Sequence, residues 1–192
     1  LELTSEYKEN YGFAIKNLLV SYFNIGDYVE TLNYATLLKN YEKSSEEDVA
    51  LASLYAAKAH TASNKSADAL KELTVAKQKS KTETGAEATY MIAEQQLKAK
   101  QWDKATATAL SISDDYSSYD YWIAKGFILM ADAYTGKGDK FQAKATLESI
   151  IDNYEVENDI YLNLTIFNEQ VLLEPQEPSR QDYVFNGWYI DE

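Results

Sequence analysis

The chain has 192 residues, no cysteine and a formal net charge of −13. The absence of cysteine excludes a disulfide framework and a thiolate metal site. The negative charge argues against nucleic acid as a partner, and so does the presence of one arginine, Arg180, among the cations. No apolar run approaches the roughly 18 residues that a membrane-spanning helix needs, so we expect no transmembrane segment.

Apolar residues recur at helical spacing along most of the chain and predict eight helices. Two capping boxes, Ser44 with Glu47 and Thr84 with Glu87, predict where the third and fifth helices begin. A polar linker is expected at 80–85. The predicted helices cover about 11–23, 28–41, 44–62, 66–79, 84–99, 102–112, 119–135 and 140–154.

A turn signal repeats four times at nearly constant spacing, with successive steps of 38, 36 and 38 residues. At each repeat a glycine or polar residue ends one helix, and five residues later a small residue begins the packed face of the next. A period of this size predicts stacked helical hairpins, and an ordinary helical bundle gives no reason for it. The pairs are Gly26 with Thr31, Asn64 with Ala69, Lys100 with Ala105, and Gly138 with Ala143.

The C-terminal residues depart from this pattern. Residues 152–192 contain ten acids and one base. Residues 159–167 partly alternate in polarity, which indicates a strand, and Asn186-Gly187 between aromatic neighbours indicates a hairpin turn. We therefore expect a helical repeat domain at 1–154, with units at about 11–43, 46–80, 84–113 and 117–154, and an acidic, partly strand-like tail at 155–192.

The repeats resemble the tetratricopeptide repeat. The first helices read Ile15-x-x-Leu18-Leu19-x-x-Tyr22 in the first unit and Phe127-x-x-Met130-Ala131-x-x-Tyr134 in the fourth, although no unit has the family's closing proline. The resemblance implies an all-α fold: a right-handed α-α superhelix of about four hairpins, with a short extended or β-hairpin-like tail. Residues 84–154 also resemble the C-terminal repeats of large Bacteroidetes tetratricopeptide proteins, which implies the periplasm or cell envelope.

The resemblance to the tetratricopeptide repeat also implies that a partner binds along a concave face lined by the first helix of each hairpin. We expect a protein or peptide partner there, and no cofactor or metal. The candidate partner-binding residues are Lys16, Val20, Phe23, Lys58, Thr61, Tyr90, Glu94, Leu97, Ile128, Asp132 and Thr135.

Catalytic patterns are missing from the sequence. The one histidine, His60, occupies an aromatic position of the repeat, which favours a packing role over catalysis. There is no HExxH motif and no phosphate-binding loop. The aromatic residues Tyr116, Tyr119, Tyr121 and Trp122 are unusually dense, and they form either a hydrophobic staple or an exposed docking patch.

These observations predict a non-enzymatic scaffold that binds a peptide or protein segment along a concave helical groove. Two alternatives remain open. The tail could serve as the ligand, through self-inhibition or self-association involving residues 159–190. The Tyr/Trp surface could instead serve as an accessory site for carbohydrate or lipid.

Overall fold

A computed structural model describes residues 5–153, with side chains for residues 10–151. The chain divides into two units, Leu1–Glu155 and Val156–Glu192, and the described residues all lie in the first. The expected strand at 159–167 and the expected hairpin at 186–187 lie outside the described residues.

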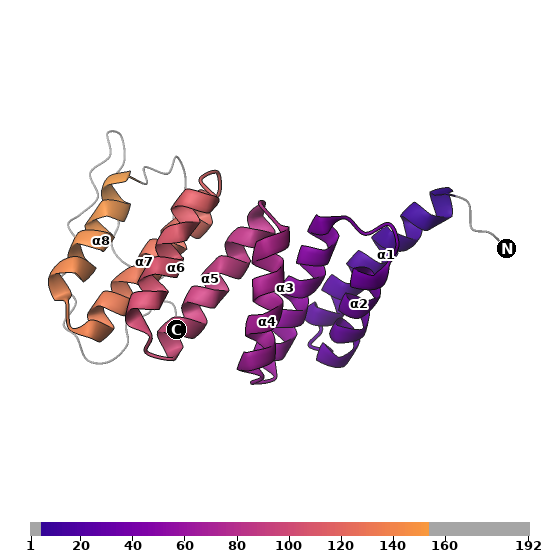
Figure 1. The fold of residues 1–192 in the computed structure, drawn as a ribbon, viewed down its shortest axis with the longest axis horizontal. Coiled ribbons are helices and arrows are strands. Elements are labelled where there is room, and N and C mark those ends of the chain that lie inside the picture. Colours follow the sequence, from indigo (N-terminus) through magenta and orange to yellow (C-terminus); the bar gives the residue numbers. More distant parts are fainter. Residues whose placement is uncertain (1–4, 154–192) are drawn as a thin grey trace, which may run out of the picture. The chain divides into compact units, whose positions relative to one another are not determined.

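Eight helices make up the regular structure of the described residues, which confirms the predicted all-α solenoid (Figure 1). Each helix packs against the one that follows it in the chain, so the helices form four hairpins stacked in sequence order. The helices are α1 (Ser5–Asn24), α2 (Tyr28–Asn40), α3 (Glu46–Ala62), α4 (Ser66–Lys79), α5 (Glu83–Lys98), α6 (Trp102–Asp115), α7 (Asp120–Lys137) and α8 (Lys140–Asn153).

The four turn signals of the sequence form the same turn in every hairpin. Gly26, Asn64, Lys100 and Gly138 all have positive φ, between 57° and 82°. The next residue then donates its N–H back to the carbonyl of the residue four positions before the turn, as in Asp27 to Tyr22 at 2.9 Å. This left-handed residue satisfies carbonyls that the helix end would otherwise leave unpaired.

Small residues let the two helices of each hairpin approach closely. Thr31, Ala69 and Ala105 are fully buried at the start of the second helices, and Ala143 is 7% exposed. On the first helices Ala57 and Ala93 are fully buried. Larger side chains at these positions would force the backbones apart, so the small residues set the spacing within each hairpin.

The odd-numbered and even-numbered helices form two layers. The backbones of α1, α3, α5 and α7 are in contact from one hairpin to the next, whereas among the described residues those of α2, α4, α6 and α8 are not. In the layer of even-numbered helices, long side chains connect neighbouring hairpins instead. Lys39 of α2 lies 2.5 Å from Glu72 of α4, and Lys77 of α4 lies 3.9 Å from Asp115 of α6.

The structure corrects both predicted capping boxes. The N-cap of α3 is Ser45, one residue later than expected, and its box partner is Asp48. Helix α5 begins at Glu83 after Thr82, whose side chain makes no capping hydrogen bond.

The polar linker expected at 80–85 is also shorter than predicted. Gly85 lies inside α5 and is buried against the hydroxyl of Tyr116. The glycine therefore serves close packing within a helix and does not mark a turn.

Candidate partner-binding face

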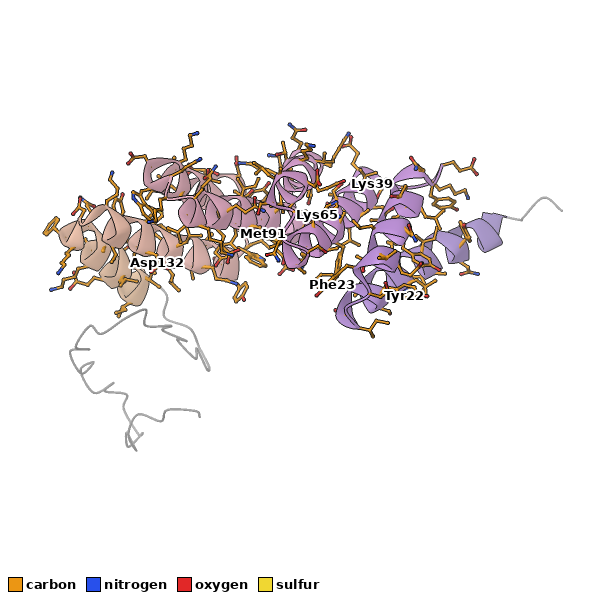
Figure 2. The ribbon with its side chains drawn as sticks, turned by 90° about the horizontal axis from the view of Figure 1, so that it is seen from below. Tyr22, Phe23, Lys39, Lys65, Met91 and Asp132 are labelled. Atoms are coloured by element: carbon orange, nitrogen blue, oxygen red, sulfur yellow. The ribbon has the colours of Figure 1, made fainter. Side chains whose placement is uncertain are left out.

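The eleven candidate residues lie on α1, α3, α5 and α7, and we call the surface of these four helices the inner face. In Figure 2, Phe23 of α1 is labelled near the lower edge of the ribbon and Lys39 of α2 nearer its upper side, with Met91 of α5 and Asp132 of α7 at intermediate height. Each pair of neighbouring helices on the inner face makes its own set of contacts.

At the junction of α1 and α3, a charge and an aromatic ring cross between the hairpins. The Lys16 ammonium lies 2.9 Å from the Asp48 carboxylate. The Phe23 ring meets the Tyr55 ring edge-on, with the ring centroids 5.4 Å apart. Val20 is half-buried. The predicted cation at this end is therefore already paired within the protein.

At the junction of α3 and α5, the second predicted cation is paired as well. The Lys58 ammonium lies 2.7 Å from the Glu87 carboxylate and 4.8 Å from the centre of the Tyr55 ring. Thr61 donates its hydroxyl hydrogen to the Ala57 carbonyl. Both Lys58 and Thr61 are half-buried. Lys58 connects two hairpins through Glu87, whereas the Thr61 hydrogen bond lies within α3.

The junction of α5 and α7 is built from aromatic rings around a lysine. The Lys125 ammonium lies 4.6 Å from the centre of the Tyr90 ring, 5.0 Å from that of Trp122 and 5.3 Å from that of Tyr121. Residues 121, 122 and 125 share one side of α7, because residues three and four apart are neighbours on a helix. The cation is attracted to the faces of these rings.

At this junction Tyr90 is half-buried, and its hydroxyl is desolvated. Burial, followed by the negative charges of Glu94 and Asp132 and by Tyr121, raises the pKa of the Tyr90 hydroxyl to about 12. Leu97, two turns further along α5, packs with Tyr90 against the core between α5, α6 and α7. Glu94 itself pairs with Lys98 at 3.0 Å.

Asp132 differs from the other charged candidates. Its side chain is exposed, and among the described side chains it forms no ion pair. Neighbouring groups nevertheless displace part of its water, and this desolvation raises the pKa of its carboxyl above the ordinary value. Thr135 is exposed and Ile128 half-buried on the same helix. Asp132 is thus a carboxylate that has no ion-pair partner among the described residues.

The dense aromatic segment at 116–122 divides between core and surface. Tyr116 is 2% exposed, and its hydroxyl lies 3.3 Å from the Ser80 carbonyl. Trp122 is 8% exposed and donates its indole N–H to Glu83 at 3.2 Å. Tyr121 is 63% exposed. The segment therefore works mainly as a staple between hairpins and leaves one ring on the surface.

Lys125 is the inner-face residue that the sequence reasoning missed. The sequence does indicate its position. Lys125 follows Trp122 by three residues and Tyr121 by four, and residues at these spacings are neighbours on a helix.

His60 is half-buried, and its Nδ1 atom has no hydrogen-bond partner in the described part. The described residues hold no group of His, Cys, Asp or Glu side chains able to bind a metal ion.

Comparison with models of known protein families identifies the repeat family of this chain. A family model for the CNOT10 tetratricopeptide repeat domain matches residues 20–172, most of the chain. The chain belongs to this tetratricopeptide repeat family. No curated protein matches it. The narrower resemblance to envelope proteins of the Bacteroidetes stays a prediction.

A tetratricopeptide repeat domain is in general a scaffold for protein–protein interaction, and it is typically non-catalytic. A protein partner is therefore the general expectation for this chain. Over the described part, no helix is both long and apolar enough to cross a membrane.

Proposed function

We propose that the inner face binds a segment of another protein that carries a lysine or arginine side chain, and that this side chain pairs with Asp132. The observation that carries the proposal is the unpaired, partly desolvated carboxylate of Asp132 on α7. A carboxylate whose pKa is raised by desolvation, and which has no ion-pair partner among the described residues, is a candidate for a binding role.

Ion pairs within the protein take up Lys16 and Lys58, whereas the Lys125 ammonium lies against the rings of Tyr90, Tyr121 and Trp122. Lys16 and Lys58 are neutralised by Asp48 and Glu87, so the inner face does not offer two free cations to an acidic ligand. Asp132 keeps its negative charge, and the chain as a whole carries −13. A basic segment would be attracted over a long range and then held at Asp132.

Apolar and aromatic groups near Asp132 suit the rest of such a segment. The Tyr121 ring is 63% exposed, and Tyr90 is close enough for its hydroxyl to sense the charge of Asp132. Ile128 lies one helical turn before Asp132 on α7. A peptide with an apolar residue near its basic residue would contact these groups together, as peptides do in helical grooves.

The two other functions have less support. Carbohydrate or lipid binding would use stacked aromatic rings, but Trp122 and Tyr116 are taken up by packing between hairpins. Self-association through residues 159–190 would depend on a part of the chain outside the described residues.

Selection of displayed random peptides on the intact chain tests the proposal. We expect the wild-type protein to enrich peptides that contain a lysine or arginine beside apolar residues. Asp132→Asn should lower the affinity for the enriched peptides by about tenfold or more, because hydrogen bonds to charged groups contribute roughly 1.5–3 kcal/mol.

Asp114→Asn is the matched control, because Asp114 is an exposed carboxylate on α6, outside the inner face. It should leave the affinity unchanged. Equal affinity for the Asp132 and Asp114 variants, or enrichment of peptides without basic residues, would refute the proposal.

A further inference from the structure

The first hairpin leaves open a helix face that the other three hairpins bury. This face of α1 contains Ala14, Leu18 and Ser21, and we call it the α1 edge. All three residues are exposed, Leu18 to 39%. Because the hairpins repeat at 38, 36 and 38 residues, each α1 edge residue has counterparts on α3, α5 and α7 that show what the face is built to contact.

The counterparts of the α1 edge are buried or half-buried. Those of Ala14 are Ala52, Ala88 and Gly126, all buried. Those of Leu18 are Ala56, 2% exposed, Met130, 7% exposed, and Ile92, which is half-buried. Those of Ser21 are Ala59 and Ala133, both fully buried, and Gln95, which is half-buried. The same face is therefore an interface at every internal junction of the solenoid.

The second helix of the preceding hairpin covers this face at each junction. Ala35 and Leu38 of α2 share a core cluster with Ala52 and Ala56 of α3. A Cβ atom added to Gly126 of α7 would come within 3.1 Å of the Ala109 carbonyl and 3.2 Å of the Ile112 side chain on α6. At each junction, the face is therefore covered by two apolar residues that lie three positions apart on the second helix of the preceding hairpin. The two helices lie so close that the residue facing this apolar pair has to be small.

The chain has one copy of this apolar pair that no following hairpin of the described part covers. Leu147 and Ile150 of α8 stand at the repeat positions of Ala35 with Leu38 and of Ala109 with Ile112. They are half-buried, whereas those four counterparts are at most 3% exposed. Phe141 and Ile151, also on α8, are 79% and 71% exposed. One end of the repeat stack thus presents the cover, and the other end presents the surface to be covered.

We propose that α8 of one copy docks on the α1 edge of a second copy, so that the chain associates head to tail. The contact continues the stacking already made three times within the protein, with the same residue types in the same register. Because it joins two different surfaces, it does not close on itself as a two-fold dimer, and each association leaves a free edge at either end.

The net charge gives this contact a recognisable salt dependence. Two copies of a chain with charge −13 repel each other. The interface itself is apolar, so screening of this repulsion should strengthen association as sodium chloride is added. An interface held by ion pairs would weaken under the same change.

Sedimentation equilibrium of the intact chain over a range of protein concentrations tests the proposal. We expect the average mass to rise above 21.8 kDa with concentration and with salt. Ala14→Arg should weaken association more than about tenfold, since it places a bulky charge where a close apolar contact forms. Ala14 is exposed, so the variant should fold.

Ala107→Arg is the matched control. It makes the same substitution at an exposed helical position whose repeat counterparts, Asn33, Lys71 and Ala145, are exposed too. It should associate like the wild type. A wild-type chain that stays monomeric at every concentration and salt, or equal association of the two variants, would overturn the proposal.

A mixing experiment identifies the surfaces. Ala14→Arg keeps an intact α8, and Leu147→Arg, once circular dichroism shows it to be folded, keeps an intact α1 edge. Each variant alone should remain monomeric, and their mixture should form dimers but nothing larger. Association of Ala14→Arg alone, or growth of the mixture beyond dimers, would contradict docking of α8 on α1.

Discussion

Replacement of Gly85 by alanine should destabilise the protein although it places a better helix former inside a helix. Gly85 lies in the first turn of α5. An alanine Cβ there would clash with the Ser80 carbonyl and lie 2.7 Å from the Tyr116 hydroxyl. Tyr116 is 2% exposed and has little room to move, so strain has to spread into the backbone between α4 and α5.

The opposing contributions can be compared. Alanine gains about 1 kcal/mol over glycine in helix propensity. Overpacking costs roughly 1–3 kcal/mol, and displacement of the Tyr116 hydroxyl from the Ser80 carbonyl costs about 1 kcal/mol more. We expect a net loss of about 1–3 kcal/mol in the free energy of unfolding, measured by urea denaturation followed by circular dichroism.

Gly12→Ala provides the matched control. Gly12 is also a buried helical glycine, but an added Cβ would meet the ring of Tyr41 at 3.0 Å, and a side chain at a helix end can yield. This variant should be neutral or stabilised by up to about 1 kcal/mol. If Gly85→Ala were as stable as Gly12→Ala, the account of the α4–α5 contact would be wrong.

Three further predictions concern α5 and α7. Ala131→Leu should separate α7 from α8 and cost roughly 1–3 kcal/mol, and an unchanged melting temperature would show that the position is not a helix crossing. The pKa of Tyr90 is raised to about 12 in the folded protein, so the stability linked to its protonated form is present below about pH 10 and is lost as the pH rises through about 12. Tyr90→Phe should therefore lose less stability than the wild type over that range in urea titrations, and parallel curves would contradict the cause given for the shift. The folded-state pKa of Asp132 is raised as well, so its ionisation at neutral pH costs stability, and Asp132→Asn should have a higher melting temperature than the wild type near pH 7 and little advantage well below about pH 4. A lower melting temperature at pH 7 would show that Asp132 has a stabilising partner.

The periodic features of the fold could be predicted because each depends on residues close together in the sequence. The turn at Gly26 needs a residue with left-handed backbone conformation, and so do the turns at Asn64 and Lys100. At the latter two positions the repeat spacing indicates the turn more clearly than the residue type does. Small residues such as Ala105 could be predicted for the same reason, since their distance from the turn sets where two helices cross.

Contacts between hairpins were harder to predict, because they depend on how far one hairpin is displaced along the next. The sequence places Lys16 and Lys58 on the correct helices, but it does not tell that Asp48 and Glu87 lie within 3 Å of them. Both lysines were expected to face a partner, whereas in the structure each is paired with a carboxylate of the next hairpin. Gly85 was assigned to a linker, since its contact with Tyr116 joins residues 31 positions apart.

A double-mutant cycle between Asp132 and the basic residue of a selected peptide tests the proposed function most directly. The cycle compares the wild-type chain and Asp132→Asn, each with the peptide and with its lysine-to-methionine form. The proposal predicts a coupling free energy of about 1 kcal/mol or more, while Asp114→Asn in place of Asp132→Asn should give none. A coupling indistinguishable from zero at Asp132 would contradict the assignment of the inner face as the binding surface for a basic segment.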